Sequence, residues 1–409
     1  MGKPKIRFKG FDNDWEQRKL GESLSFLKDG THGTHADADG GPLLLSAKNI
    51  KDGTIKWDET DRRISQEEFE KIHANFSLKT GDILLTIVGS IGEIAILKES
   101  EGLTFQRSVA FLRPKEDILS EFLCTEIQTP IFQKELESRK STSAQPGIYL
   151  GDLAEIPVKY TISLDEQNKI GEYFLKLDHL ITLHRRKCEE TKKLKKYMLQ
   201  KMFPQNGSKV PEIRFKGFTD DWEQRKLNEI ADKVLEKNKN NEFLEPFTNS
   251  AEQGIISQKD YFDREIVNNE NLDNYYIVRN NDFIYNPRIS VTAPVGPINR
   301  NRLGRNGIMS PLYTAFRTHD VDNLYLEFYF KTTSWHHFMK MNGDSGARFD
   351  RFTISSIQFM EMPIPYPTLE EQRKIGTYLE SLDHLITLHQ NKCEELKKIK
   401  KYMLQNMFV

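Results

Sequence analysis

The residues best suited to metal chemistry are the histidines of the heptapeptide DHLITLH, which occurs at 178–184 and again at 383–389. In each copy the two histidines are five residues apart. They therefore lie on different faces of a helix, whereas a helical metal site needs the i, i+4 spacing. We expect His184 and His389 to be seam residues of a helix rather than metal ligands.

Other constellations with catalytic chemistry are missing. The tetrapeptide YNPR (285–288) approaches the Pro-Pro motif of amino-methylating enzymes but lacks the second proline, and no Pro-Asp pair begins a nuclease signature. The only Gly-Lys pair is Gly2-Lys3, so there is no P-loop. The stretch VGSIGE (88–93) lies between two predicted strands and precedes no helix, which favours a β-turn over a phosphate loop. The sequence predicts no catalytic residue and no metal site.

Composition indicates a soluble protein of two or three domains. The 409 residues are 37% hydrophobic and 29% charged, with a net charge of −1. No apolar run approaches the roughly 18–20 residues that cross a membrane. Only three cysteines are present, which favours a reducing, cytoplasmic location. Cys188 and Cys393 fall in the helix seam as buried thiols, with a disulfide between them as the lesser alternative.

The chain consists of two halves that share repeated segments. FKGFDNDWEQRKL (8–20) returns as FKGFTDDWEQRKL (215–227), with eleven of thirteen positions identical. The segments 166–203 and 371–408 match at 28 of 38 positions. Each half therefore has a shared lead-in, a body that differs between the halves, and a shared closing segment.

The closing segments have the pattern of long helices. Apolar residues recur at alternating spacings of three and four, from Ile170 through Leu194 to Met202 and from Ile375 through Ile399 to Met407. A helix with a single apolar seam needs a partner, and the other copy is the obvious one. A pseudo-twofold axis between the copies predicts antiparallel pairing.

The bodies read as mixed α/β globules rich in strands. GDILLTIVGSIGEIAIL (81–97) and YYIVRNNDFIYNP (275–287) alternate apolar runs with Gly or Asn turns, and each body closes on an IP strand. The first helix runs into a short linker, PQNGSKV (204–210), and then into the second lead-in, whereas the second helix runs to the end of the chain. We expect the two chain termini to lie close together, as in a ring of two repeats that is opened once.

This layout resembles the specificity subunit of Type I restriction–modification systems. The resemblance covers essentially the whole chain and rests on the alternation of divergent bodies with repeated helices that open on EQ-x-KI-x-x-Y. It implies an α+β fold: two mixed α/β target-recognition domains, separated by two long antiparallel coiled-coil helices, in a pseudo-twofold tandem repeat. The expected boundaries are 1–160, 161–205, 206–367 and 368–409. A duplicated scaffold that binds protein or carbohydrate is the alternative.

The resemblance also implies partners. Double-stranded DNA would be read as a bipartite, gapped site by a chain that has no catalysis of its own. Two methyltransferase subunits would bring S-adenosylmethionine for adenine methylation, and endonuclease/translocase subunits would use ATP and Mg²⁺. The chain itself would bind no cofactor and no membrane. Because both helices are net positive while the whole chain is not, the bodies are acidic, and DNA binding should be weak without the partners.

Candidate DNA contacts are polar residues on glycine-rich or turn-rich stretches. The stretch LKDGTHGTHADADGGPLLLSAKNIKDG (27–53) is similar to one seen in many recognition domains. Hydroxyl, amide and cationic groups can bind base edges or phosphates, although these loops can also simply face solvent. The candidates in the first body are Thr31, His32, Thr34, His35, Ser46, Lys48, Asn49, Gln106, Arg107 and Gln145. Those in the second body are Arg288, Ser290, Thr292, Arg348 and Arg351.

The repeated lead-in is not expected to read DNA, because both halves share it. We expect Phe8, Phe11 and Trp15 to pack where the first body joins the helix ends. Phe215, Phe218 and Trp222 should do the same in the second half. A shared surface for methyltransferase docking is the functional alternative.

Overall fold

The computed structural model describes residues 2–141, 146–205, 207–239, 241–261, 269–344 and 350–408. The chain forms two compact units, Met1–Lys187 with His389–Val409 and Cys188–Leu388. The two long helices, α5 (Leu164–Lys201) and α10 (Leu369–Asn406), are 38 residues each and contribute to both units. The units cut across these helices, so the four-part domain division stays a prediction.

The helices pair in opposite directions within each unit. In the first unit, His184 Nδ1 lies 3.0 Å from His389 Nδ1, and Lys400 Nζ donates to Asp178 Oδ1 at 2.6 Å. In the second unit, Cys188 Sγ lies 3.9 Å from the Ile386 carbonyl oxygen. Residue numbers rise along one helix as they fall along the other, which confirms antiparallel pairing.

The predicted seam is wrong near one end of each helix. Leu194 and Ile399 are exposed, whereas the side chains of their neighbours Lys195 and Lys400 are only 16% and 17% exposed. At this position each helix turns the next residue inward, and that residue is a lysine paired with a carboxylate of the other helix, Asp383 for Lys195 and Asp178 for Lys400. The predicted seam resumes beyond it, since Met202 and Met407 are buried.

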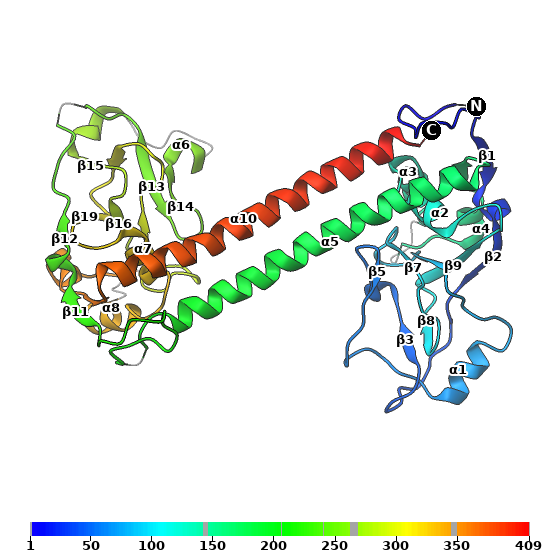
Figure 1. Cartoon of the computed structure of the whole chain (residues 1–409), viewed down its shortest axis with the longest axis horizontal. Helices are drawn as coiled ribbons and strands as arrows, with labels where there is room; N and C mark the ends of the chain where they lie inside the picture. Colours follow the sequence, from blue (N-terminus) through cyan, green and yellow to red (C-terminus); the bar gives the residue numbers. More distant parts are fainter. Residues whose placement is uncertain are drawn as a thin grey trace. The chain divides into compact units, whose positions relative to one another are not determined.

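The first body is built from small sheets and short helices (Figure 1). A four-stranded sheet has the order β2 (Leu24–Asp29), β9 (Val109–Pro114), β6 (Ile83–Thr86), β7 (Ile94–Ile96). Two further pairs are the parallel β3 (Leu43–Leu45) and β8 (Leu103–Phe105), and the hairpin β4 (Ile50–Lys51) and β5 (Thr54–Ile55). The helices are α1 (Gln66–Ile72), α2 (Ser120–Ile127), α3 (Pro130–Ser138) and α4 (Leu150–Ala154), with 3-10 turns η1 (Leu20–Ser23) and η2 (Ala47–Asn49).

The second body has two four-stranded sheets. One has the order β12 (Ala231–Lys233), β19 (Thr314–Thr318), β16 (Phe283–Tyr285), β17 (Ile298–Arg300), and the other β14 (Gly254–Ser257), β13 (Pro246–Ser250), β18 (Gly307–Met309), β15 (Tyr276–Val278). The helices are α6 (Gln258–Tyr261), α7 (Asn323–Phe330), α8 (His336–Asn342) and α9 (Ser356–Met360), with 3-10 turns η3 (Leu227–Glu229) and η4 (Asn269–Asn274). Mixed α/β bodies are confirmed in both halves.

A buried aspartate explains the motif that the bodies share. Asp82 follows Gly81, which has φ +93°, and Asp282 follows Asn281, which has φ +73°. Glycine and asparagine tolerate this left-handed conformation best. Each carboxylate then accepts two hydrogen bonds from one arginine, Arg113 or Arg317. In the first body, the pair of Asp82 and Arg113 therefore joins the turn before β6 to the neighbouring β9. In the second, the pair of Asp282 and Arg317 joins the turn before β16 to the neighbouring β19.

Both lead-ins pack as expected at the joint between body and helices. Each lead-in forms a strand, β1 (Glu16–Lys19) or β11 (Glu223–Lys226), paired with the closing strand of its body, β10 (Pro157–Tyr160) or β20 (Pro363–Tyr366). Trp15 contacts the rings of Phe122 and Phe408, and Trp222 contacts Tyr325.

An ion pair fixes each lead-in to the first turn of its helix. Arg7 donates to both oxygens of Glu166 at 2.6 and 2.9 Å, and Arg214 does the same to Glu371 at the same distances. Both glutamate side chains are fully buried. The conspicuous EQ of each helix start is therefore a structural anchor.

The two ends of the described chain meet in the first unit, as predicted (Figure 1). The Ile6 amide donates to the Asn406 carbonyl at 2.9 Å. In the second unit the same bond joins Ile213 to Lys201 at 2.9 Å, and there the linker connects the two segments covalently. Among the described residues, no helix is long and apolar enough to cross a membrane.

Candidate nucleic-acid interface

The first body brings three separate candidate stretches together at the carboxyl ends of β3 and β8. Because these strands are parallel, Ser46 and Gln106, which follow them, lie at the same edge. The Gln106 amide donates to the Leu45 carbonyl at 2.8 Å. Thr31 joins them, because its amide donates to the Phe105 carbonyl at 2.9 Å and its carbonyl accepts from the Arg107 amide at 3.0 Å.

Gly30 allows this close approach. A Cβ atom on Gly30 would lie 2.1 Å from the Phe105 carbonyl oxygen and 2.4 Å from that of Gln106. Both neighbours are backbone atoms, so no rotamer change relieves the clash. Position 30 must therefore be glycine for Thr31 to reach the end of β8.

Two of the candidates are buried and already paired inside the protein. His35 is 8% exposed and lies between Thr31 Oγ1 and Glu68 Oε1, each at 2.7 Å. Asn49 is 4% exposed. Its side-chain oxygen accepts from the Ser46 backbone amide, and its side-chain nitrogen donates to the Lys56 carbonyl and to Asp61 Oδ1. These side chains hold the two loops in place, and a base contact from either would break internal hydrogen bonds.

The exposed candidates form the accessible surface of this edge. His32 and Lys48 are each 64% exposed and pair with Asp29 and Asp61 at 2.6 and 2.9 Å. Hydrogen bonds from Asn49, from Lys48 and from a backbone amide lower the pKa of Asp61 to about 2, so its carboxylate stays charged. A phosphate would compete with that carboxylate for Lys48.

Arg107 is an exposed cation at this edge. Among the residues that the structure describes, it forms no ion pair. Gln106 precedes Arg107 in the sequence, pairs with Thr31 through the backbone and is half-buried. Thr34 is exposed. Gln145 lies outside the described residues.

In the second body the candidates line a groove of about 620 Å³. Arg288, Ser290, Thr292 and Arg351 all lie on it. Arg348 is outside the described residues.

The backbone holds the two arginines side by side. Arg288 and Arg351 form an antiparallel bridge, flanked by bonds from the Ile289 amide to the Asp350 carbonyl at 3.1 Å and from the Phe352 amide to the Pro287 carbonyl at 2.7 Å. Both guanidinium groups lie 4.0 Å from the Asp350 carboxylate, which is a loose contact. The arginine side chains are 68% and 36% exposed, so both can reach a ligand.

Asparagines that the sequence interpretation missed build the floor of the groove. Asn249 accepts from Asn299 at 2.7 Å and donates to the Ile284 carbonyl at 2.7 Å. Asn286 donates to the Asn249 carbonyl and accepts from the Arg288 amide at 2.9 Å, which positions Arg288. The YNPR stretch was the part of the sequence that could have indicated this floor, because its Asn286 and Pro287 form hydrogen bonds there.

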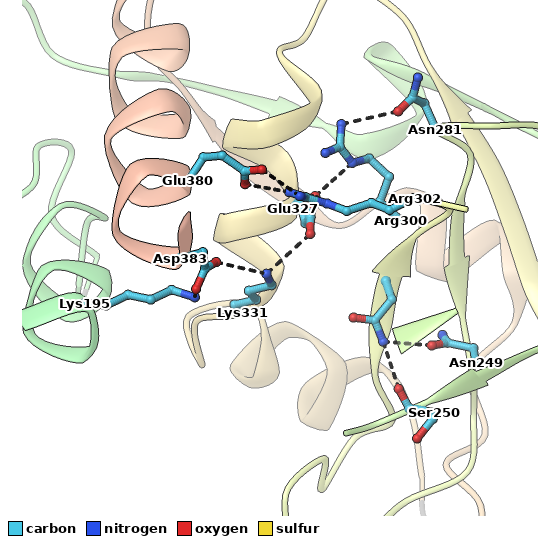
Figure 2. A network of polar contacts seen from close by, with 11 residues as sticks. Lys195, Asn249, Ser250, Asn281, Arg300, Arg302, Glu327, Lys331, Glu380 and Asp383 are labelled. Carbon is cyan, nitrogen blue, oxygen red and sulfur yellow. Dashed lines mark hydrogen bonds and ion pairs between the residues drawn. The ribbon is translucent and has the colours of Figure 1, made fainter. Parts of the chain in front are cut away.

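An ionic network between α7 and the long helices fixes the second body (Figure 2). Arg302 donates to Glu327 at 2.8 Å and to both oxygens of Glu380 at 2.8 and 2.9 Å. Lys331 adds a contact to Glu327 at 3.3 Å, and Asp383 pairs with Lys195. The Arg302 bonds hold the pKa of Glu380 below its ordinary value. Glu327 is 8% exposed, so its charge is compensated inside the joint.

Comparison with known proteins identifies both halves. The family model described as "Type I restriction modification DNA specificity domain" matches residues 13–193 and 219–398. The chain is 27% identical to the putative type I restriction enzyme MjaX specificity subunit of Methanocaldococcus jannaschii, across 96% of the chain and 92% of that protein. It is 28% identical to the EcoBI specificity subunit of Escherichia coli over 38% of the chain and 33% of that protein.

The fold has a solved counterpart. The crystal structure of a Type I restriction-modification system S subunit from M. genitalium aligns with a TM-score of 0.61 and 15% identity, covering 100% of this chain and 99% of the other. At this identity the likeness shows the shared fold.

Proposed function

The chain belongs to the Type I restriction–modification specificity family and carries two specificity domains, and from this premise we propose that each domain reads one half of a bipartite, gapped DNA site. The observation that supports this proposal is that each body gathers exposed cations and hydroxyls at one place, but with different residues. In the first body these are Thr34, Lys48 and Arg107, and in the second they are Arg288, Ser290, Thr292 and Arg351. The family match gives no support to the alternative of a protein- or carbohydrate-binding scaffold.

Different side chains imply different half-sites. Arginine pairs with guanine O6 and N7 in the major groove, amides and hydroxyls bind other base edges, and lysine contacts phosphate. Arg107, Arg288 and Arg351 are the proposed base readers. Lys48, His32 and the hydroxyls of Thr34, Ser290 and Thr292 are the proposed orienting contacts. His35 and Asn49 hold the loops that carry them.

The catalytic steps belong to partners in this proposal. Two methyltransferase subunits with S-adenosylmethionine would modify adenine, and endonuclease/translocase subunits with ATP and Mg²⁺ would cleave unmodified DNA. The net-acidic bodies support this division, because phosphate contacts dominate DNA affinity and an acidic surface repels phosphate. The chain acts as the non-catalytic reader of the complex.

A comparison of modified bases tests the proposal. Sequencing of cells with and without the gene should show one two-part, gapped methylation motif that disappears when the gene is removed and returns when it is restored. Loss of the gene without loss of any such motif would contradict the proposal.

A further inference from the structure

Two serine-anchored turns place aliphatic side chains at the groove of the second body. In the first turn, the Ser290 amide donates to the Ala293 carbonyl at 3.1 Å, and the Ala293 amide donates back at 3.2 Å. In the second, the Tyr313 amide donates to the Ser310 carbonyl at 3.1 Å, and the Leu312 amide lies 3.4 Å from Ser310 Oγ. Val291 and Leu312 occupy the central positions of these turns.

Neither aliphatic side chain contributes to the core. Val291 is 100% exposed and Leu312 is 60% exposed, yet both line the groove together with Arg288 and Arg351. A single exposed aliphatic residue needs no explanation. Two of them, on separate hydrogen-bonded turns of one groove whose cations suit an anionic ligand, indicate an apolar feature on that ligand.

DNA offers one such feature to a protein in its major groove. Among the base edges exposed there, the C5-methyl group of thymine is the apolar one, and aliphatic side chains contact it. We infer that Val291 and Leu312 select thymine in the half-site of the second body by packing on its methyl group. Arg288 and Arg351 fix the register beside it on guanine or on phosphate. This inference rests on the proposed function.

The test removes the methyl group from DNA and the side chain from the protein. Once the motif is known, each thymine of both strands is replaced in turn by deoxyuridine, which lacks only the C5-methyl group. Binding and methylation are then measured with the complex reconstituted from this chain and its methyltransferase. We expect a loss of about fourfold at one or two thymines, all in one half-site, which corresponds to burial of one methyl group.

Variants assign that loss to the groove. V291A or L312A should weaken binding to the thymine site by a similar factor and should show no further loss with deoxyuridine at the same position. L244A, which removes an aliphatic side chain that is 67% exposed and not part of the groove, should bind and discriminate as the wild type does. Because Val291 and Leu312 are exposed, unfolding temperatures should not change.

Three results overturn the inference while leaving the proposed function intact. One is a motif that is methylated but insensitive to deoxyuridine. Another is V291A and L312A variants that lose affinity equally with and without the methyl group, which indicates a wedge between base steps. The third is variants that lose methyltransferase binding instead of DNA selectivity. A complex with no gapped motif at all would instead contradict the proposed function.

Discussion

A single buried carboxyl group is expected to make the stability of the first body depend on pH. Glu126 on α2 is 6% exposed; its Oε1 accepts from the Lys159 amide at 3.0 Å, and among described groups its Oε2 has no hydrogen-bond partner. Burial raises its pKa to about 7 from an ordinary 4.5. The folded state therefore holds a proton that the unfolded state releases, so stability should fall as the pH rises from about 4.5 to 7.

The E126Q variant tests this linkage. Thermal unfolding followed from pH 4.5 to 8.5 should show a declining melting temperature for the wild type and a flatter profile for E126Q, with the variant more stable above pH 7. E116Q changes an exposed glutamate of the same body and should follow the wild type. Parallel profiles for the wild type and E126Q would refute the assignment.

At the residue scale, the sequence predicted where polar groups gather better than which of them reach solvent. Thr31, Ser46 and Gln106 lie together because each follows a strand, and strand ends can be read from apolar runs. His35 and Asn49 could not be told apart from their exposed neighbours, because their burial depends on Glu68 and Asp61, which are distant in the sequence. The asparagine floor of the groove was missed for the same reason.

The one glycine of each long helix sets how closely a body helix approaches it. A Cβ atom on Gly171 would lie 2.7 Å from the Cβ of Glu121 on α2, and one on Gly376 would lie 2.7 Å from the Cβ of Leu324 on α7. Alanine normally favours a helix over glycine by about 1 kcal/mol. Here the added methyl group would instead separate two packed helices.

We expect G376A to destabilise the protein by about 1–3 kcal/mol, as overpacking of a close contact does. T377A, at the exposed neighbouring position of α10, should leave stability almost unchanged. Denaturant unfolding curves of the two variants against the wild type measure the difference. A stabilising G376A would show that the helices do not need the close approach.

The histidine pair in the helix seam predicts a second, opposite pH effect. Burial, the neighbouring His389 and the charges of Lys187 and Lys392 lower the pKa of His184 from its ordinary 6.5. The lowered pKa means that the folded state resists protonation. Its contribution to stability is therefore present above pH 6.5 and is lost as the pH falls below it.

Replacement of both histidines by leucine should remove this acid sensitivity and should leave the helical circular-dichroism signal intact. The H179A/H384A double variant changes exposed histidines of the same helices and should keep it. Equal loss of helix signal on acidification in all three proteins would place the sensitivity elsewhere.

At the element scale, the helices, their antiparallel pairing and the closing IP strands could all be predicted from periodicity and repetition. The inward lysines could not, because each is held by a carboxylate of the other helix, Asp383 or Asp178, that is distant in the sequence. The network of Arg302, Glu327 and Glu380 was also invisible, since charged residues at these spacings read as a solvated face until α7 is packed against α10.

At the scale of the whole molecule, the equivalent bonds from Ile6 to Asn406 and from Ile213 to Lys201 predict tolerance of circular permutation. A chain opened within 204–210 and closed by a copy of that linker between residues 408 and 4 should keep the melting temperature and the methylation motif. A chain opened within α5 instead should lose both. If the chain opened within 204–210 does not fold, the two junctions are not equivalent.

The two bodies are proposed to read two half-sites independently. Methylation maps of cells that carry R107A or the R288A/R351A double variant test it most directly, with K134A, which changes an exposed lysine on α3, as the control. Loss of a bidentate contact to guanine costs about 1–3 kcal/mol of discrimination. R107A should relax or weaken one half of the motif and R288A/R351A the other half, whereas K134A should change neither. Changes in the same half from both arginine variants, or in neither half, would contradict it.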